Sequence, residues 1–311
     1  MLPVLDRPML DWAVERLVAA GVTDVVLSLG YRPDAFRGAY PYGRCCGAKL
    51  HYAVEPEPLD TAGAIRFAAI EAGLDRGSEP FLVINGDVIT EADPTALLEL
   101  HRRAGAEATI LLTPVDDPSR YGVVPIRPDG QVEAFVEKPP LGSAPSNWIN
   151  AGTYVLQPSV LAHIPAGRKV SIERDTFPAL VATGTVYASQ SDAYWIDAGT
   201  PESFLAVQLH LLRSSATYVG PGARVSADAV VEQSVVMAGA RVGSGAVLRR
   251  SVLLPGAVLE AGAVVEDSIL GCDATVGEGA RLSDHSVIGD GIVVAAGSVL
   301  VEARLPGGQP E

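Results

Sequence analysis

The sequence is poor in aromatic and charged side chains, and these shortages exclude several classes of protein. Of its 311 residues, 6% are aromatic and 19% are charged, and the formal net charge is −14. It has no run of Lys or Arg that would neutralise a phosphate backbone, so we expect no nucleic-acid partner. No apolar stretch is long enough to cross a membrane, so we expect no membrane partner either.

Cysteine is also scarce, and the N-terminus lacks the features of a secretion signal. The three cysteines are Cys45, Cys46 and Cys272, which have neither the spacing of a zinc site nor the pattern of a disulfide framework. No basic segment followed by an apolar core is found at the start of the sequence, as a signal peptide would require. We therefore expect reduced thiols in a cytoplasmic protein.

The first two thirds of the chain alternate between helix and strand patterns. Leu10, Val14 and Val18 share one helical face, and Gly21 is placed to end that helix. The runs "DVVLSLG", "PFLVINGD" and "EATILLTPV" predict buried strands, whereas "TAGAIRFAAIEAG" and "DPTALLELHRRAG" predict helices. Farther on, "YGVVPIRPDGQVEAFVEKP" predicts a β-hairpin. This order predicts an α/β fold with a Rossmann-like mixed, mainly parallel sheet covered on both faces.

The last third of the chain is a repeat. A Val, Leu, Ile or Met recurs every five or six residues, usually with Ala, Ser or Thr two positions before it. The aliphatic positions are 219, 225, 231, 237, 242, 248, 254, 259, 265, 270, 276, 282, 288, 294 and 300. Large inward side chains and small corner residues are typical of a triangular solenoid. The pattern resembles the left-handed parallel β-helix of hexapeptide repeats and predicts about five coils.

These two patterns predict the domain organisation. We expect an α/β domain over residues 1–213, which includes a connector helix at about 201–213. The β-helix should span 217–303, and residues 304–311 should form a tail. Because an open coil end exposes unpaired strand edges, we also expect a homo-oligomer.

Two aspartates come directly after predicted strands. Asp87 ends "VINGD", and Asp197 lies within "YWIDAGT". Ligands of an open α/β sheet bind beyond the carboxyl ends of its strands. Carboxylates that converge there would suit Mg²⁺, although each aspartate alone is equally suited to a turn or a helix N-cap.

Four further segments carry polar or small residues suited to a sugar or a phosphate. In "EPEPLDTAGAI", Thr61 to Gly63 would leave backbone N–H groups open at a helix N-terminus, unless they only cap that helix. "FVEKPP" places a lysine beside a proline, where it would offer a point charge to a phosphate. "WINAGTY" supplies Asn150 beside Gly152, which suits sugar hydroxyls. "VSIERDTFP" places Glu173 and Arg174 in a polar turn, where they would equally form a local ion pair.

Taken in order, these segments resemble one enzyme family. The set is "EPEPLDTAGAI", "VINGD", "RYGVV", "VEKP", "NAGTYV", "SIERDTFP" and "YWIDAGTPESF", and hexapeptide coils come after it. It is similar to the sugar-1-phosphate nucleotidyltransferases, or NDP-sugar pyrophosphorylases, and most similar to mannose-1-phosphate guanylyltransferases. The resemblance spans residues 3–300. It implies a Mg²⁺-dependent, in-line transfer of a nucleotidyl group from an NTP to a sugar 1-phosphate, with release of pyrophosphate.

The resemblance also implies roles for individual residues. Asp87 and Asp197 would hold Mg²⁺, and Lys138 would bind the sugar phosphate, so these three form the catalytic set. The nucleotide would be contacted by Glu55, Leu59, Thr61, Ala62, Gly63 and Gly86. The sugar would be read by Gly122, Glu137, Asn150, Gly152 and Glu173. GTP and mannose 1-phosphate are the expected substrates, and a glucose-1-phosphate thymidylyl- or uridylyltransferase is the alternative.

The sequence departs from the family pattern at two places. Asp60 stands where the family usually has glycine, so the backbone contact to the base would differ. The family also begins with a strand and a loop G-G-x-G-T-R-L-x-P-L-T and then P-K-P, whereas "MLPVLDRPML" matches only the residues after that lysine. A sheet without that strand would have a gap and two exposed edges. We therefore expect a truncated, poorly active chain, with a non-catalytic regulatory or scaffold homologue as the alternative.

Overall fold

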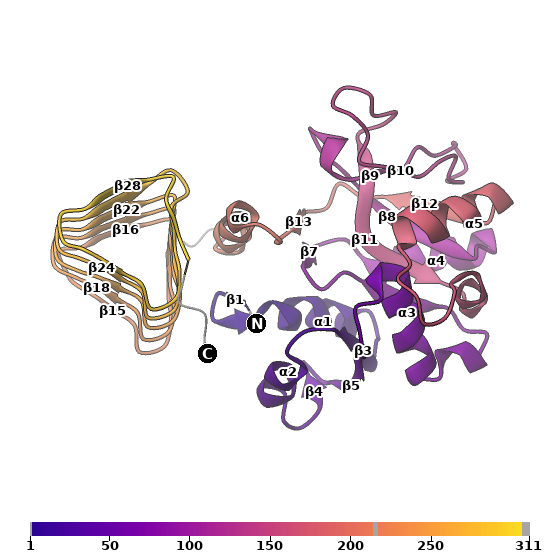
Figure 1. Cartoon of the computed structure of the whole chain (residues 1–311), viewed down its shortest axis with the longest axis horizontal. Helices are drawn as coiled ribbons and strands as arrows, with labels where there is room; N and C mark the ends of the chain where they lie inside the picture. Colours follow the sequence, from indigo (N-terminus) through magenta and orange to yellow (C-terminus); the bar gives the residue numbers. More distant parts are fainter. Residues whose placement is uncertain (1, 214–216, 307–311) are drawn as a thin grey trace. The chain divides into compact units, whose positions relative to one another are not determined.

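The computed structural model describes residues 2–213 and 217–306, which fall into two compact units. The first, which we call the α/β unit, comprises Leu10–Trp195. The second, the solenoid unit, comprises Ile196–Glu311 together with Met1–Met9. Figure 1 colours the α/β unit from indigo to pink, and the coils of the solenoid unit from orange to yellow.

The α/β unit is built around a mixed sheet with the strand order β10-β9-β11-β8-β12, in which β6 also pairs with β11. Its strands are β6 (Phe81–Ile84), β8 (Ala108–Pro114), β9 (Gly122–Val123), β10 (Val136–Glu137), β11 (Trp148–Leu156) and β12 (Val186–Gln190). Strands β8 and β12 are parallel, whereas β11 runs antiparallel to β6 and β8. The mixed sheet expected from the sequence is confirmed.

A smaller sheet lies in the same unit. It contains β3 (Asp24–Leu29) parallel to β5 (Ala48–Val54), and β4 (Arg44–Cys45) antiparallel to β5. Helix α1 (Met9–Ala19) packs Val14 against Leu27 and Leu29 of β3. Among the described residues, β3 pairs with β5 and β6 pairs with β11, so each is an edge strand of its own sheet. The strands thus form two sheets, where the sequence pattern suggested one.

Helices and short turns complete the α/β unit. They are α2 (Pro33–Ala39), α3 (Asp60–Glu71), η1 (Leu74–Arg76), α4 (Pro94–Ala104), η2 (Pro118–Arg120), η3 (Pro158–His163), η4 (Ile172–Thr176) and α5 (Phe177–Thr183). Two further strands are β7 (Val88–Thr90) and β13 (Trp195–Asp197). The segment "SIERDTFP" was expected to be a polar turn, but it forms the π-type turn η4 and continues into α5. Burial of Ile172 and Phe177 in the main core favours this helical path.

The solenoid consists of three parallel sheets, one on each side of a triangular coil (Figure 1). The first sheet contains β14 (Thr217–Val219), β17 (Ser234–Val236), β20 (Val252–Leu253), β23 (Ile269–Leu270), β26 (Val287–Ile288) and β29 (Arg304–Leu305). The second contains β15 (Arg224–Val225), β18 (Arg241–Val242), β21 (Val258–Leu259), β24 (Thr275–Val276) and β27 (Val293–Val294). The third contains β16 (Val230–Glu232), β19 (Val247–Arg249), β22 (Val264–Glu266), β25 (Arg281–Ser283) and β28 (Val299–Val301). The β-helix of about five coils is confirmed.

The interior of the solenoid matches the repeat, with a shift on one side. Val236 and Leu253 belong to the interior cluster, one residue before the positions 237 and 254 that the repeat indicated. Met237 and Leu254 are buried but lie outside that cluster. The reason is strand register, because Val236 pairs with Leu253, which in turn pairs with Leu270. The regular spacing identified the coils but misplaced these two side chains.

Residues 3–8 form a hairpin in the solenoid unit. Strands β1 (Pro3–Val4) and β2 (Arg7–Pro8) are joined by Leu5 and Asp6, both with positive φ. Gln208, on helix α6 (Pro201–Leu211), donates to the carbonyl oxygen of Pro3 at 2.8 Å and accepts from the amide of Leu5 at 3.1 Å. Leu-Asp is not a typical hairpin turn pair, so local signals did not reveal this turn.

Candidate functional site

A bulge in β11 sets the position of Asn150. The pairing of β11 with β8 shifts register between Asn150 and Tyr154. Gly152 lies in the bulge at a φ of +69°, and a Cβ atom there would lie 2.7 Å from Nδ2 of Asn85. The Asn150 amide donates to the Tyr154 hydroxyl at 2.8 Å, and its oxygen accepts from the Gly152 N–H at 3.0 Å. Bulges of this kind re-aim a side chain, and this one fixes both ends of the Asn150 amide.

The hairpin of β9 and β10 holds Glu137 opposite Gly122. A Cβ atom at Gly122 would lie 2.7 Å from the Phe135 ring and 3.1 Å from Oε2 of Glu137, so only glycine leaves this space open. Burial raises the pKa of Glu137; the charge of Lys138 opposes this, and that of Glu173 adds to it. The glutamate is thus held in a partly desolvated position beside a second carboxylate.

Lys138 comes directly after Glu137 and has a left-handed backbone at a φ of +47°. Its N–H donates to the carbonyl oxygen of Tyr121 at 3.0 Å, and its Nζ lies 3.8 Å from Oε1 of Glu137. Such a conformation is rare for a residue other than glycine and is found disproportionately at functional sites. The backbone therefore fixes the direction in which this side chain leaves the hairpin.

Glu173 is held by hydrogen bonds from two segments. Its Oε2 accepts from the Thr61 hydroxyl and from the Ser171 hydroxyl, both at 2.8 Å. The Thr61 oxygen also accepts from the Ile172 N–H at 2.8 Å. The N-terminus of α3 and the turn η4, far apart in the sequence, are therefore joined at this carboxylate.

The amide groups at the start of α3 are not open, which corrects one expectation from the sequence. The N–H groups of Ala62 and Gly63 donate to the carbonyl oxygen of Val170 at 2.9 and 3.2 Å, and that of Thr61 donates to Oδ1 of Asp60. Asp60 has a φ of +60°, a conformation that glycine adopts more readily, and aspartate tolerates it through local hydrogen bonding. The helix terminus is tied to the neighbouring chain segment, so the role of these amides in nucleotide binding stays a prediction.

The remaining nucleotide candidates also have structural contacts. Glu55 Oε2 accepts from the Leu59 N–H at 3.0 Å, and its Oε1 accepts from the Ser28 hydroxyl at 3.2 Å. Leu59 is buried, and Gly63 packs so closely that an added Cβ would lie 2.9 Å from the Arg168 carbonyl oxygen. These contacts explain the residue types without a ligand, so a nucleotide role for this segment stays a prediction.

Asp87 and Gly86 form an exposed turn after β6, as expected from "VINGD". The pKa of Tyr154 is raised mainly by burial and further by the charge of Glu173, with smaller contributions from Glu137 and Asp87. Three of the carboxylates selected from the sequence therefore act on one buried phenol.

Asp197 lies in the solenoid unit, at the end of β13. Its Oδ1 accepts from the Gly199 N–H at 2.8 Å, which is the turn geometry that the alternative interpretation of this aspartate predicted. The next helix, α6, begins with a reciprocal cap between Thr200 and Ser203. A metal-binding role for Asp197 stays a prediction.

Sequence reasoning missed several residues that shape the site. Tyr154 holds Asn150, Asn85 fills the space beside Gly152, and Ser171 holds Glu173. Trp195 donates from Nε1 to the Ala151 carbonyl oxygen at 2.8 Å, and its ring meets that of Tyr121 edge-on at 5.8 Å. "NAGTY" contains Tyr154, but no sequence signal distinguishes an aromatic residue that supports a site from one that only fills the core.

Comparison with known proteins identifies the class. Residues 1–214 match the nucleotidyl transferase family, and residues 214–306 match the GMPPB C-terminal domain. The chain therefore belongs to the nucleotidyl transferase family, as the ordered segments had indicated. This is a family of enzymes, and among the helices that the structure describes none is long and apolar enough to cross a membrane.

Two of the relatives to which the chain is similar are named as mannose-1-phosphate guanyl- or guanylyltransferases. The mannose-1-phosphate guanyltransferase of Emericella nidulans is 44% identical over 203 residues, which cover 64% of this chain and 54% of that protein. The mannose-1-phosphate guanylyltransferase of Mycobacterium tuberculosis is 39% identical over 218 residues, which cover 70% and 59%. The chain thus spans little more than half the length of these relatives.

Two solved structures are also similar to the chain. A crystal structure of HddC from Yersinia pseudotuberculosis complexed with GMP-PN has a TM-score of 0.58 and 31% identity, and covers 68% of this chain and 88% of that one. A putative glucose-1-phosphate thymidylyltransferase from Bacillus anthracis has a TM-score of 0.60 and 26% identity, with 68% and 85% covered.

Proposed function

We propose that this chain carries the sugar-phosphate site of a mannose-1-phosphate guanylyltransferase, which joins GTP and mannose 1-phosphate to give GDP-mannose and pyrophosphate. The observation that carries the proposal is the group of polar side chains around the buried Tyr154. Asn150 contacts its hydroxyl, and the charges of Glu137 and Glu173 act on it. Sugar hydroxyls need donors and acceptors in fixed places, and these three side chains supply them.

The reaction requires the protein mainly to position the two substrates and to neutralise their charge. An oxygen of the sugar 1-phosphate forms a bond to the α-phosphorus of the NTP, while the bond to the β-phosphate oxygen breaks and pyrophosphate leaves with that electron pair. Positioning and neutralisation of charge dominate such transfers. We assign Lys138 to the phosphate of the sugar, because its Nζ lies 3.8 Å from Oε1 of Glu137 and so places a positive charge beside the residues proposed to read the sugar.

The residues present suit a hard divalent cation. Asp87 is exposed at the end of β6 and adds to the negative potential at Tyr154, and carboxylate and phosphate oxygens are the ligands that Mg²⁺ prefers. We propose Asp87 as a ligand, and Asp197 remains the second candidate on sequence grounds. Bound there, Mg²⁺ would supply charge neutralisation at the triphosphate.

Calorimetric titration of the 311-residue chain with sugar phosphates tests this proposal, together with a pyrophosphate-release assay. We expect mannose 1-phosphate to bind more tightly than glucose 1-phosphate. Lys138→Met should weaken that binding at least about tenfold because it removes a charge-assisted contact. Lys49→Met, at an exposed lysine on β5, is the matched control and should bind as the unaltered chain does.

Other results would overturn or replace this assignment of substrate. Failure to bind any sugar 1-phosphate would overturn the proposal. A preference for glucose 1-phosphate with dTTP or UTP would replace it with the thymidylyl- or uridylyltransferase alternative, which the similarity to the Bacillus anthracis structure favours. Binding of mannose 1-phosphate without pyrophosphate release agrees with the poorly active chain expected from the sequence and with a non-catalytic homologue, whereas robust turnover would contradict both.

Self-association remains a separate proposal. Among the described residues, Val293, Val299 and Val301 of the last coil are exposed, and β27, β28 and β29 each end a sheet. Unpaired strand edges with apolar side chains favour pairing with a second copy. Sedimentation analysis of the chain and of a Val299→Lys variant tests this, and a concentration-independent monomer would contradict it.

A further inference from the structure

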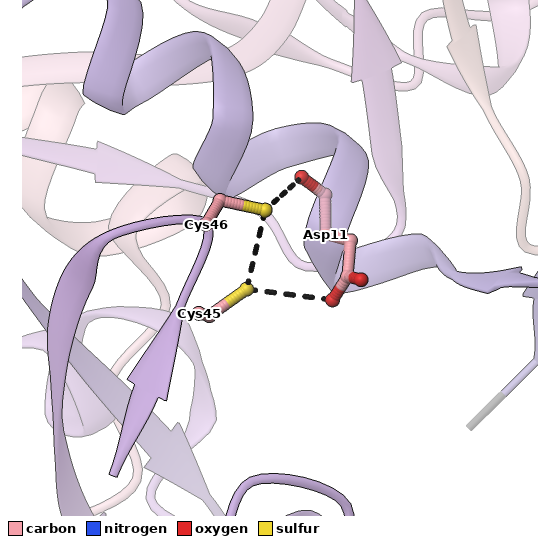
Figure 2. A group of neighbouring side chains, drawn as sticks. All are labelled: Asp11, Cys45 and Cys46. Carbon is pink, nitrogen blue, oxygen red and sulfur yellow. Dashed lines mark hydrogen bonds between the residues drawn. The ribbon is translucent and has the colours of Figure 1, made fainter. Parts of the chain in front are cut away.

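Two thiols and a carboxylate lie close together in the α/β unit, at residues that are not part of the polar group around Tyr154. Asp11 is in the first turn of α1, Cys45 is in β4, and Cys46 is in the turn between β4 and β5. One potential ligand atom from each of the three side chains lies within 4.8 Å of the other two. Figure 2 shows the two thiols turned toward the aspartate of the neighbouring helix.

The backbone explains how adjacent cysteines share one side. Successive side chains of a strand point to opposite faces, which would separate the two thiols. Here Cys45 pairs with Ala48, so Cys46 and Gly47 form a two-residue turn, with φ values of +49° and +99°. The left-handed backbone at Cys46 brings its thiol back to the side of Cys45, and the Sγ atoms lie 3.8 Å apart.

These separations match the edges of a metal tetrahedron. Zinc with Zn–S bonds of about 2.3 Å and tetrahedral angles holds two sulfur ligands about 3.8 Å apart, and a sulfur and an oxygen ligand about 3.5 Å apart. The observed Sγ–Sγ distance is 3.8 Å, and Cys45 Sγ lies 3.4 Å from Oδ1 of Asp11. Two of the three ligand–ligand separations therefore have tetrahedral lengths, and the third, between Cys46 and the Asp11 carboxylate, lies within 4.8 Å.

A neighbouring phenol orients the aspartate. The Tyr40 hydroxyl donates to Oδ1 of Asp11 at 2.5 Å. Partners of this kind fix the orientation of metal-ligating side chains. Arg44 also donates to the Gly47 carbonyl oxygen at 3.2 Å, which places a positive charge beside the turn.

We propose that Asp11, Cys45 and Cys46 form a Zn²⁺ site, with solvent as the fourth ligand. Two thiolates select a thiophilic cation over Mg²⁺ or Ca²⁺, and a single carboxylate is compatible with zinc. Cys46 is exposed and Cys45 is buried, so the cation enters from the side of Cys46. Binding ties α1 to the β4–β5 hairpin and stabilises this part of the α/β unit.

Zinc titration of the reduced 311-residue chain, in competition with a chromophoric chelator, tests the site. We expect one equivalent of Zn²⁺ bound and a rise in the thermal unfolding midpoint when zinc is added. Cd²⁺ should give thiolate-to-metal charge-transfer absorption in the ultraviolet. Cys46→Ser and Asp11→Asn should each weaken binding at least about tenfold, since loss of even an outer partner has an effect of this size.

Two further variants keep the test decisive. Cys272→Ser removes the only other cysteine and should bind zinc as the unaltered chain does. Tyr40→Phe should weaken binding while leaving one equivalent bound. Because Cys45 is buried, its replacement risks misfolding, so the exposed Cys46 carries the test, with circular dichroism to confirm the fold. Equal zinc binding by the unaltered chain and Cys46→Ser, or loss of binding only in Cys272→Ser, would overturn the proposal.

Discussion

The Thr61 hydroxyl donates a hydrogen bond of 2.8 Å to Oε2 of Glu173, which is 112 residues farther along the chain. The Thr61 hydroxyl oxygen in turn accepts from the backbone N–H of Ile172. One short side chain therefore fixes both the carboxylate proposed to read the sugar and the backbone of the turn that carries it. The two elements that it joins, α3 and η4, both border the main core of the α/β unit.

Replacement of Thr61 by valine should cost both stability and sugar-phosphate binding. Valine has nearly the same shape as threonine but makes neither hydrogen bond, so the Ile172 N–H loses this acceptor. We expect the free energy of unfolding to fall by about 1–3 kcal/mol. Urea unfolding measures the first effect, and calorimetry with mannose 1-phosphate measures the second. Thr61→Ser retains the hydroxyl and should keep most of the stability and most of the binding. If Thr61→Ser and Thr61→Val lost equal amounts of both, the methyl group and not the hydroxyl would be responsible.

Two glycines with left-handed backbones allow the cost of backbone strain to be measured apart from the cost of a steric clash. Gly142 has a φ of +74° with nothing within 4 Å of an added Cβ, whereas a Cβ at Gly152 would meet Asn85 at 2.7 Å. We expect Gly142→Ala to cost about 1–2 kcal/mol, from backbone strain alone. Gly152→Ala should cost about 1–3 kcal/mol more, because it overpacks the bulge.

Gly152→Ala should also weaken sugar-phosphate binding, because it disturbs Asn150. Unfolding midpoints and calorimetry of the two variants provide the comparison. Equal stabilities would mean that Asn85 moves aside without cost.

The raised pKa of Glu137 predicts a definite dependence of stability on pH. The folded state holds this proton more tightly than the unfolded chain does, so ionisation of Glu137 opposes folding. Its contribution to stability falls as the pH rises from the ordinary glutamate pKa through the raised one. Glu137→Gln cannot ionise, so its stability relative to the unaltered chain should be greater at about pH 7 than at about pH 4.

Denaturant unfolding of both proteins across this range measures the difference. Glu57→Gln, at an exposed position, is the control, and its difference in stability from the unaltered chain should change much less with pH. A Glu137→Gln advantage that shrinks as the pH rises would mean that the Lys138 pairing outweighs burial.

The third sheet of the solenoid offers a test of its packing. Val265 in β22 is fully buried, whereas Val299 in β28 is 68% exposed. Val265→Ala should cost about 2–3 kcal/mol, since it removes two methyl groups and leaves a cavity. Val299→Ala should change stability by less than about 0.5 kcal/mol. Thermal unfolding measures both, and a large loss from Val299→Ala in a self-associating chain would indicate that this valine lies in the interface.

Much of the fold could be predicted from local patterns. The helical spacing of Leu10, Val14 and Val18 predicted α1, and the apolar runs predicted β3, β6 and β8. The coils were visible because the same spacing holds from the first repeat to the last. Where one side of the coil shifts by a residue, at Met237 and Leu254, the spacing misled, because strand pairing sets which of two adjacent apolar residues faces inward.

The sequence identified polar residues of the candidate site but not the hydrogen bonds that hold them. Glu137, Asn150 and Glu173 stood out because of their segments. Their partners Tyr154 and Ser171 carry no distinguishing signal, and Thr61 was selected for its backbone amide, whereas the structure uses its hydroxyl. The open amides expected at Ala62 and Gly63 were wrong for the same reason: their acceptor, Val170, comes from a distant segment. Hydrogen bonds between distant segments depend on chain topology, which periodicity does not encode.

By itself, the sequence determined the two kinds of architecture, the order of the elements and the family, because periodicity and short motifs specify these. Only the tertiary structure decided that Gly152 lies in a bulge that aims Asn150, and that three carboxylates act on Tyr154. Only the tertiary structure placed Asp11 beside Cys45 and Cys46, a pair whose spacing had given no indication of a metal site. The physical reason is the same throughout: a residue type sets which interactions are possible, and the folded backbone sets which atoms are close enough to make them.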